Sequence, residues 1–173
     1  DSHDVPRFHN DNKISKDMLK GALIMLFTLP GSASIYYGDE AEISGTVDSM
    51  EGARYPMPWS KNIEETFSYK LYSSLSHLKT EYDSFKNGGF KILWDEGFIF
   101  AFARFTPSEL FISVCSNSEK IEKIELPLAI FGESFALDKK IDYDFLNESV
   151  SCSVKDGKLF LSVPAQKSFL IKI

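Results

Sequence analysis

The sequence has little cysteine, no excess of basic residues and no long apolar run. Its two cysteines, Cys115 and Cys152, are too few for a disulfide scaffold and lack the spacing of metal ligands. We interpret both as small apolar side chains in strands, although a bridge between neighbouring strands stays open. The net charge of −6 lacks the basic excess typical of nucleic-acid-binding proteins, and it disfavours attraction to anionic lipid. Neutral ligands therefore fit better.

The longest apolar run, residues 22–30, is too short to cross a bilayer, and no charged-then-apolar signal segment opens the chain. We therefore expect no nucleic-acid partner and no membrane partner, and a cytoplasmic location is favoured. The first residue is Asp1 rather than methionine, so the compartment of the natural protein stays open.

The composition is that of a folded protein rich in aromatic residues. Of 173 residues, 43% are apolar, which is enough to build the core of one ordinary domain. The 15 Phe, 7 Tyr and 2 Trp fit either a β-sandwich core or a sugar-stacking surface. Core packing is favoured, also for Trp94.

The first half of the chain predicts two helices with a strand and a long loop between them. Ser15 is the expected N-cap of a helix over residues 16–29, which Pro30 and Gly31 end. A short apolar run at 34–37 predicts a buried strand of the parallel type, across which Tyr36 and Tyr37 would alternate. Residues 38–62 predict a long loop, and helical spacing of apolar residues predicts a second helix over residues 65–82.

The second half predicts an antiparallel β-sandwich or Greek key. Apolar and polar residues alternate in several short segments, and Asp156-Gly157 is a strong hairpin signal. The expected strands cover 90–94, 98–105, 110–116, 122–127, 149–154, 158–163 and 168–173. The acidic stretch 138–144 is interpreted as a solvated loop, and the domain boundary is expected near residues 84–89.

The first half lacks the partners that its own predicted strand needs. A parallel strand requires neighbours on both sides for its backbone groups, and two helices cannot supply them. We infer that this half closes a larger α/β barrel or sheet that begins upstream. Self-association as a homo-oligomer, or partial disorder before residue 86, is then expected for the isolated chain.

Three motifs carry a resemblance to a known family. Residues 1–7 read Asp-Ser-His-Asp-Val-Pro-Arg, residues 29–40 hold Leu-Pro-Gly and then Tyr-Tyr-Gly-Asp-Glu, and residues 53–59 read Ala-Arg-Tyr-Pro-Met-Pro-Trp. In this order and approximate spacing they resemble the end of the catalytic domain in the alpha-amylase superfamily, glycoside hydrolase family 13. The resemblance is closest to the neopullulanase and cyclomaltodextrinase branch, and with the β-rich tail it covers nearly the whole chain.

The resemblance implies a fold in two parts. Residues 1–85 would be the C-terminal end of a (β/α)8 TIM barrel, from the end of strand seven to helix eight, with 34–37 as strand eight. Residues 86–173 would be an antiparallel β-sandwich domain. Active sites of such barrels lie on loops at the C-terminal ends of the strands, where residues 1–4 and the loop 38–62 would fall.

The resemblance also implies roles for individual residues. Asp4 matches the family's third carboxylate, the transition-state stabiliser, and His3 matches a histidine that binds the same sugar ring. Arg54 and Trp59 lie on the loop after strand eight, where sugar contact and loop anchoring are equally expected. That loop departs from the family's common Asp-Pro-Asp at residues 49–52, which puts its sugar contacts in doubt. No metal site and no cofactor are expected.

The family's nucleophilic Asp and acid Glu belong to earlier strands that precede Asp1. A retaining mechanism needs this pair about 5 to 5.5 Å apart, so hydrolysis by this chain alone is expected to be negligible. Asp39 and Glu40 are poor substitutes, because adjacent residues at a strand exit point in different directions. Arg7 is expected to tie a loop by an ion pair, with Glu40 as the obvious kind of partner.

The resulting hypothesis is a C-terminal fragment of a retaining glycoside hydrolase. Its substrates would be malto-oligosaccharides, cyclodextrins or related α-glucans, and transfer to a sugar acceptor instead of water stays open. One alternative is a non-catalytic carbohydrate-binding or scaffold protein, which predicts exposed aromatic residues on one face of the β-domain. A second alternative is a family-like subunit of a membrane transporter, which would need an upstream transmembrane helix.

Overall fold

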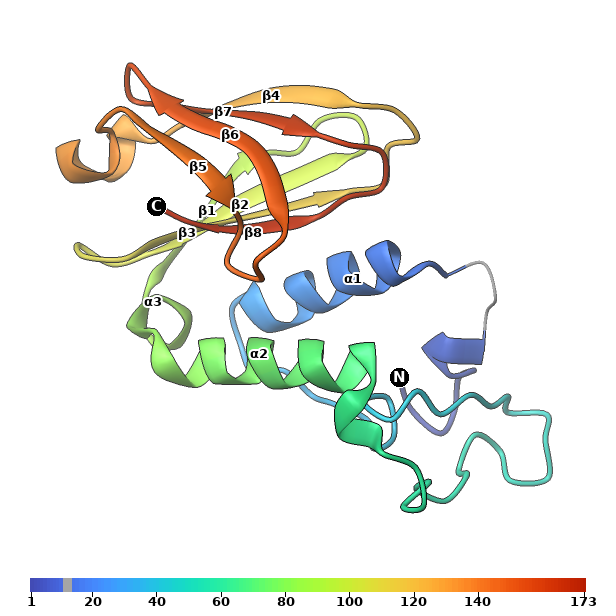
Figure 1. The fold of residues 1–173 in the computed structure, drawn as a ribbon. Coiled ribbons are helices and arrows are strands. Elements are labelled where there is room, and N and C mark those ends of the chain that lie inside the picture. The colour runs from blue at the N-terminus through green and yellow to red at the C-terminus, as the bar shows by residue number, and fades with distance from the viewer. Residues whose placement is uncertain (11–13) are drawn as a thin grey trace.

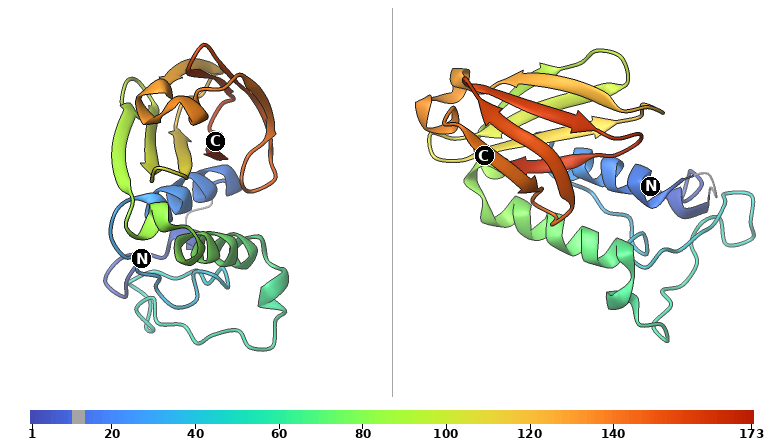
Figure 2. Two further views of the ribbon diagram at one scale, coloured as in Figure 1. Left: turned by 90° about the vertical axis from the view of Figure 1, so that its left-hand side faces the viewer. Right: turned by 45° about the horizontal axis from the view of Figure 1, so that its top comes forward.

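The computed structural model describes residues 1–10 and 14–173, which form helices packed against one face of a β-sandwich (Figure 1). The helices are α1 (Lys16–Thr28), α2 (Phe67–Glu81) and the short α3 (Asp83–Lys86), with 3-10 turns at Phe8–Asn10, Ile63–Glu65, Ala129–Phe131 and Glu133–Phe135. Figure 2 shows the helices together on one side and both sheets on the other. Residues 84–89, where a domain boundary is predicted, cover the end of α3 and the start of the first strand.

Both long helices begin at side-chain caps. Ser15 Oγ accepts a hydrogen bond from the N–H of Met18 at 3.2 Å, as predicted for the start of α1. Thr66 Oγ1 accepts one from the N–H of Tyr69 at 3.1 Å, so α2 begins at Phe67, two residues after the predicted start. In each case a hydroxyl satisfies a backbone donor that the first turn would leave without a partner.

The sandwich consists of two four-stranded antiparallel sheets, as the alternating segments predicted. One sheet has the order β1-β2-β3-β8 and the other β4-β7-β6-β5. The strands are β1 (Gly89–Trp94), β2 (Ile99–Phe105), β3 (Leu110–Ser116), β4 (Glu122–Pro127), β5 (Lys139–Tyr143), β6 (Ser149–Lys155), β7 (Lys158–Val163) and β8 (Phe169–Lys172). Every strand pair among the described residues is antiparallel, so no part of a parallel barrel sheet is seen here.

Two apolar cores lie on opposite faces of the sheet β1-β2-β3-β8. The first lies between the two sheets, with Ile112, Leu126 and Leu159 fully buried, and Trp94 packs at its edge as predicted. The second lies between the same sheet and the helices, where Ile24 and Leu75 are fully buried. This sheet is therefore covered on both faces, and alternate residues of β3 serve different cores.

A buried lysine ties α1 to the sandwich. The Lys20 side chain is 2% exposed, and its Nζ lies 3.1 Å from Asp144 Oδ2 and 3.0 Å from Glu148 Oε2. Asp144 is itself buried, and its Oδ1 accepts hydrogen bonds from the N–H groups of Leu146 and Glu148, each at 2.9 Å. Residues 144–148, the connection from β5 to β6, are therefore locked onto the helix by charge-assisted hydrogen bonds.

The solvated loop predicted over residues 138–144 is wrong. Lys139–Tyr143 forms β5, an edge strand paired with β6, and Asp144 is only 5% exposed. Charged side chains on edge strands are a common defence against edge-to-edge pairing, and here they obscure the strand's alternation.

The strand predicted at 34–37 is also wrong for this structure. Residues 32–36 have no regular secondary structure, and Ser34 and Ile35 are exposed. Tyr36 and Tyr37 do not alternate across a sheet, because their rings contact each other edge to face with centroids 4.9 Å apart. The apolar composition is that of a strand, but the chain provides no neighbouring strand to pair with it.

Both cysteines are free and buried, so the bridge that the sequence left open is not formed. Burial raises the pKa of the Cys115 thiol, and that of Cys152, to about 12. No helix among residues 1–10 and 14–173 is long and apolar enough to cross a membrane.

Replacing Lys20 with methionine is predicted to destabilise the fold strongly. The substitution leaves the buried Asp144 carboxylate without its cation. Removing one partner of a buried ion pair lowers the free energy of unfolding by about 3–5 kcal/mol. Urea unfolding followed by circular dichroism measures the change. The matched control is Lys70→Met on α2, whose ion pair with Glu65 is exposed and should contribute little. Equal losses in both variants would contradict the role of Lys20.

Candidate functional site

Arg7 is the anchor of the segment that carries the first motif. Its side chain is fully buried, and Nη1 lies 2.9 Å from Asp39 Oδ1 and donates to the carbonyl oxygen of Tyr37 at 2.6 Å. Nε donates to the carbonyl oxygen of Ala53 at 3.1 Å. One guanidinium thus holds together the segments that carry all three sequence motifs.

Two tyrosine rings complete the surroundings of Arg7. Its guanidinium carbon lies 4.0 Å from the centroid of the Tyr36 ring and 4.8 Å from that of Tyr37. The backbone N–H of Arg7 also donates to the carbonyl oxygen of Gly45 at 2.9 Å. A planar cation can stack on aromatic faces and use its edge for hydrogen bonds at the same time, which a lysine cannot do.

The predicted ion-pair partner, Glu40, is wrong. Arg7 pairs with the neighbouring Asp39, whereas Glu40 Oε2 accepts a hydrogen bond from the N–H of Gly38 at 2.9 Å. Burial raises the pKa of the Asp39 carboxyl, and the hydrogen bond and charge of Arg7 oppose that shift. Sequence gave no means of choosing between two adjacent acids, because the choice depends on how the turn at Gly38 orients them.

His3 and Asp4 lie at the surface, close to each other. His3 Nε2 is 3.3 Å from Asp4 Oδ1, and the two side chains are 49% and 75% exposed. The N–H of Asp4 donates to Ser2 Oγ at 3.1 Å, and Asp1 Oδ2 accepts from the N–H of Phe8 at 2.8 Å. These local bonds form a turn that presents the histidine and the carboxylate outward, three residues before the buried Arg7.

Arg54 and Trp59 are exposed on the long loop, and no hydrogen bond or ion pair among the described residues joins them to His3 or Asp4. Arg54 Nη1 donates to the carbonyl oxygen of Gly52 at 3.3 Å, and Trp59 is 79% exposed. The same loop surrounds a hollow of about 440 Å³ lined by residues 41–46, Tyr55, Pro58 and Lys61. None of the four predicted site residues lines it.

His9 was not singled out by the sequence, although it lies beside the same cluster. Its Nε2 atom is buried without a hydrogen-bond partner among the described residues, and so is Arg7 Nη2. Burial lowers the pKa of His9, while the charge of Glu42 raises it. A buried polar atom without a partner is costly, so this cluster has unused hydrogen-bonding capacity.

The arrangement offers one exposed carboxylate beside an imidazole. Such a pair can bind sugar hydroxyls and stabilise positive charge that develops on a sugar ring. Double displacement requires two carboxylates, and Asp4 is the only carboxylate among the four predicted site residues. No group of three or more His, Cys, Asp or Glu side chains in the described part of the chain is arranged to hold a metal ion.

Comparison with known proteins gives relatives much longer than this chain. An amylopullulanase of Thermoanaerobacterium thermosulfurigenes is 27% identical over 166 residues, which is 92% of this chain and 9% of the relative. A cyclomaltodextrinase of Thermoanaerobacter pseudethanolicus is 34% identical over 125 residues, which is 72% of this chain and 21% of the relative. The matches lie in the C-terminal part of these larger proteins. No protein-family model matches the chain.

The fold also has close neighbours among solved structures. An alpha-amylase of Anoxybacillus superimposes with a TM-score of 0.77 and 24% identity, over 99% of this chain and 36% of the neighbour. Relatives and structural neighbours from alpha-amylase-family enzymes therefore cover the chain, and the predicted resemblance is confirmed. The chain spans only a minor part of each of them.

Replacing Arg7 with lysine is predicted to loosen the motif-bearing segments while leaving the sandwich intact. A single ammonium group cannot reproduce the contacts to Tyr37, Asp39 and Ala53. Hydrogen–deuterium exchange should become at least about tenfold faster in peptides spanning 37–55, which corresponds to a loss of about 1.4 kcal/mol in the cost of local opening. Exchange in β3 should be unchanged. The control is Arg54→Lys, at an exposed arginine of the same loop, and equal acceleration there would argue against the anchor.

Proposed function

From the relatives that cover this chain, we propose that it is the C-terminal portion of a retaining glycoside hydrolase that acts on α-glucosidic bonds. Its substrates would be malto-oligosaccharides, cyclodextrins or related α-glucans, with water or a second sugar as acceptor. Residues 1–85 would be the end of the catalytic barrel, and residues 86–173 the β-sandwich domain that caps it. The observation that carries the proposal is the match of nearly the whole chain to amylopullulanase and cyclomaltodextrinase sequences.

Buried polar atoms without partners and exposed apolar side chains in the first half support a parent protein longer than this chain. Arg7 Nη2 and His9 Nε2 are buried without partners among the described residues, and Val5 and Ile35 are 46% and 42% exposed. Further barrel strands beside 34–37 would supply backbone partners and cover these apolar side chains.

In this proposal the residues of the chain bind and stabilise rather than cleave. His3 would hydrogen-bond hydroxyls of the sugar at the scissile bond. The Asp4 carboxylate would stabilise the positive charge that develops on that ring in the transition state. The nucleophile and the general acid would come from upstream strands, so the 173-residue chain alone would have negligible activity.

The mass of the natural protein tests the proposed domain assignment. We expect intact-mass measurement in the native source, with detection through peptides of the sandwich, to give a mass well above the 19.6 kDa of this chain. The excess should be at least most of a barrel of roughly 250 residues. A mass equal to that of this chain would overturn the hydrolase assignment and favour a sugar-binding or scaffold protein.

Replacing Asp4 with asparagine tests the proposed role of the carboxylate. In the intact protein, kcat on maltodextrin should fall at least about 100-fold, because the variant removes an electrostatic interaction made most strongly in the transition state. The matched control is Asp95→Asn, which makes the same chemical change in the exposed β1–β2 turn and should keep activity. Unchanged kcat in Asp4→Asn would refute the assignment of this residue.

A further inference from the structure

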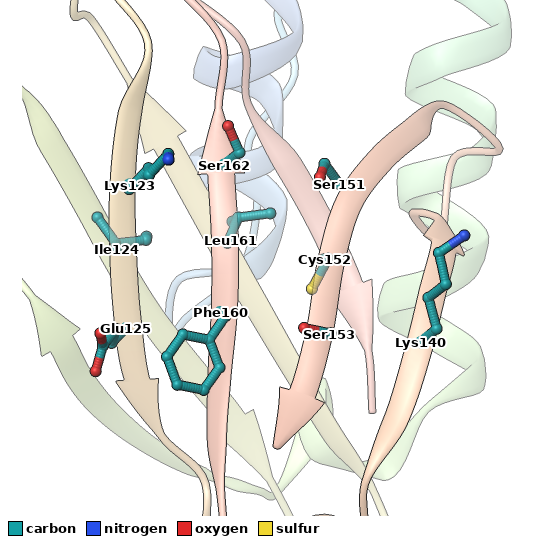
Figure 3. A pocket seen from close by; sticks show the side chains of 10 residues that line it. All are labelled: Lys123, Ile124, Glu125, Lys140, Ser151, Cys152, Ser153, Phe160, Leu161 and Ser162. Carbon is teal, nitrogen blue, oxygen red and sulfur yellow. The ribbon is translucent and has the colours of Figure 1, made fainter. Parts of the chain in front are cut away.

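The outer face of the sheet β4-β7-β6-β5 is hollowed in its middle. The hollow has a volume of about 470 Å³ and lies on the side of the sandwich away from the helices (Figures 1 and 3). Its side chains belong to two rows that run across the strands. One row is Lys123, Ser162 and Ser151, and the other is Glu125, Phe160, Ser153 and Lys140.

The length of the side chains produces this shape. The central strands β6 and β7 present short serines and the Phe160 ring, whereas the edge strands β4 and β5 present long lysine and glutamate side chains. The edge residues are exposed, while Phe160, Ser153 and Ser162 are half-buried. The result is a trough, here termed the serine trough, with charged walls and a floor of hydroxyls beside one aromatic ring.

The hydroxyls of the serine trough are free to bind a ligand. Some serine hydroxyls elsewhere bond within the protein, as Ser113 does to Thr28 and Ser118 to Glu122. Within the described residues, no such bond is made by the side chains of Ser151, Ser153 and Ser162. Each can both donate and accept, which suits a ligand that carries many hydroxyl groups of its own.

The charges of the walls favour a neutral ligand. Glu125 lies opposite Lys140 in the second row, and its carboxylate is already paired with Lys158 Nζ at 3.2 Å. Lys140 is paired with Asp142. Of the charged residues that line the serine trough, only Lys123 has no ion pair within the described residues. The electrostatic field in the serine trough is therefore not strong in either sign.

We propose that the serine trough is a binding site for a neutral oligosaccharide, with the Phe160 ring stacked on the apolar face of a sugar and the serines bonded to its hydroxyls. The choice of an α-glucan as that oligosaccharide rests on the proposed function. The site would hold a substrate chain on the sandwich, and it takes part in no bond cleavage.

The test is affinity electrophoresis of the intact protein at low temperature in gels that contain soluble starch. Phe160→Ala should weaken the binding of starch roughly fivefold, since stacking on an aromatic ring contributes about 1 kcal/mol. Ser153→Leu, which fills the serine trough, should weaken it as well. The matched control is Phe98→Ala, which removes a 68% exposed aromatic ring from the β1–β2 turn and should leave retardation unchanged. Circular dichroism checks that each variant is folded.

The remaining outcomes separate this inference from the proposed function. If Phe160→Ala and Ser153→Leu both fold and bind starch as the control does, the serine trough is not a sugar site, whereas activity on maltodextrin would still support the proposed function. Retardation by a β-linked glucan and not by starch would overturn the α-glucan assignment. Release of bound starch by inorganic phosphate at constant ionic strength would overturn the neutral-ligand assignment.

Discussion

The buried charge of Lys20 constrains the arrangement of the whole molecule. A lysine ammonium that is removed from water must be paired, and Asp144 and Glu148 are the groups that pair with it. They lie in the β5–β6 connection, about 125 residues away in sequence and on the sheet opposite to the one that α1 covers. The helix therefore packs on one sheet through apolar side chains and is bound by this ion pair to a connection of the other sheet.

Arg7 is a second buried cation, and it holds together the segments that carry the three sequence motifs. Its partners are three backbone or side-chain oxygens at Tyr37, Asp39 and Ala53, in segments that have no regular secondary structure. The loop that contains Arg54 and Trp59 is thus held by Arg7 at Asp39 and Ala53, while the side chains of Arg54 and Trp59 are exposed. His3 and Asp4 follow the same pattern, because they are exposed just before the buried anchor. The proposed ligand contacts are therefore exposed side chains in segments that the buried Arg7 holds in place.

Much of this architecture was predictable from local sequence, and the failures have physical causes. The hydroxyl cap at Ser15 and the alternation in β7 are local signals, and the structure confirms both. β3 and β8 form strands as predicted, but they are buried on both faces instead of half-buried, because the helices cover the outer face of their sheet. The charged residues of the edge strand β5 predict a loop where the structure has a strand. The burial of Asp144 is not predictable locally, because its partner, Lys20, lies far away in sequence. The run at 34–37 has the composition of a buried strand, but pairing depends on neighbours that composition does not reveal. The roles of His3 and Asp4 came from resemblance to a family, and they stay predictions.

The two halves of the chain differ in how completely their apolar side chains are buried and their buried polar groups are hydrogen-bonded. The sandwich pairs its strands into two sheets, and its apolar cores lie between those sheets and beneath the helices. In the first half, buried polar atoms of Arg7 and His9 have no partner among the described residues, and Ile35 is exposed where a strand would be buried. Such a segment gains stability from any added surface that supplies acceptors and covers apolar groups. Because the helices pack on the sandwich through an apolar core and through Lys20, an upstream domain that completed the first half would be joined through them to the sandwich that carries the serine trough.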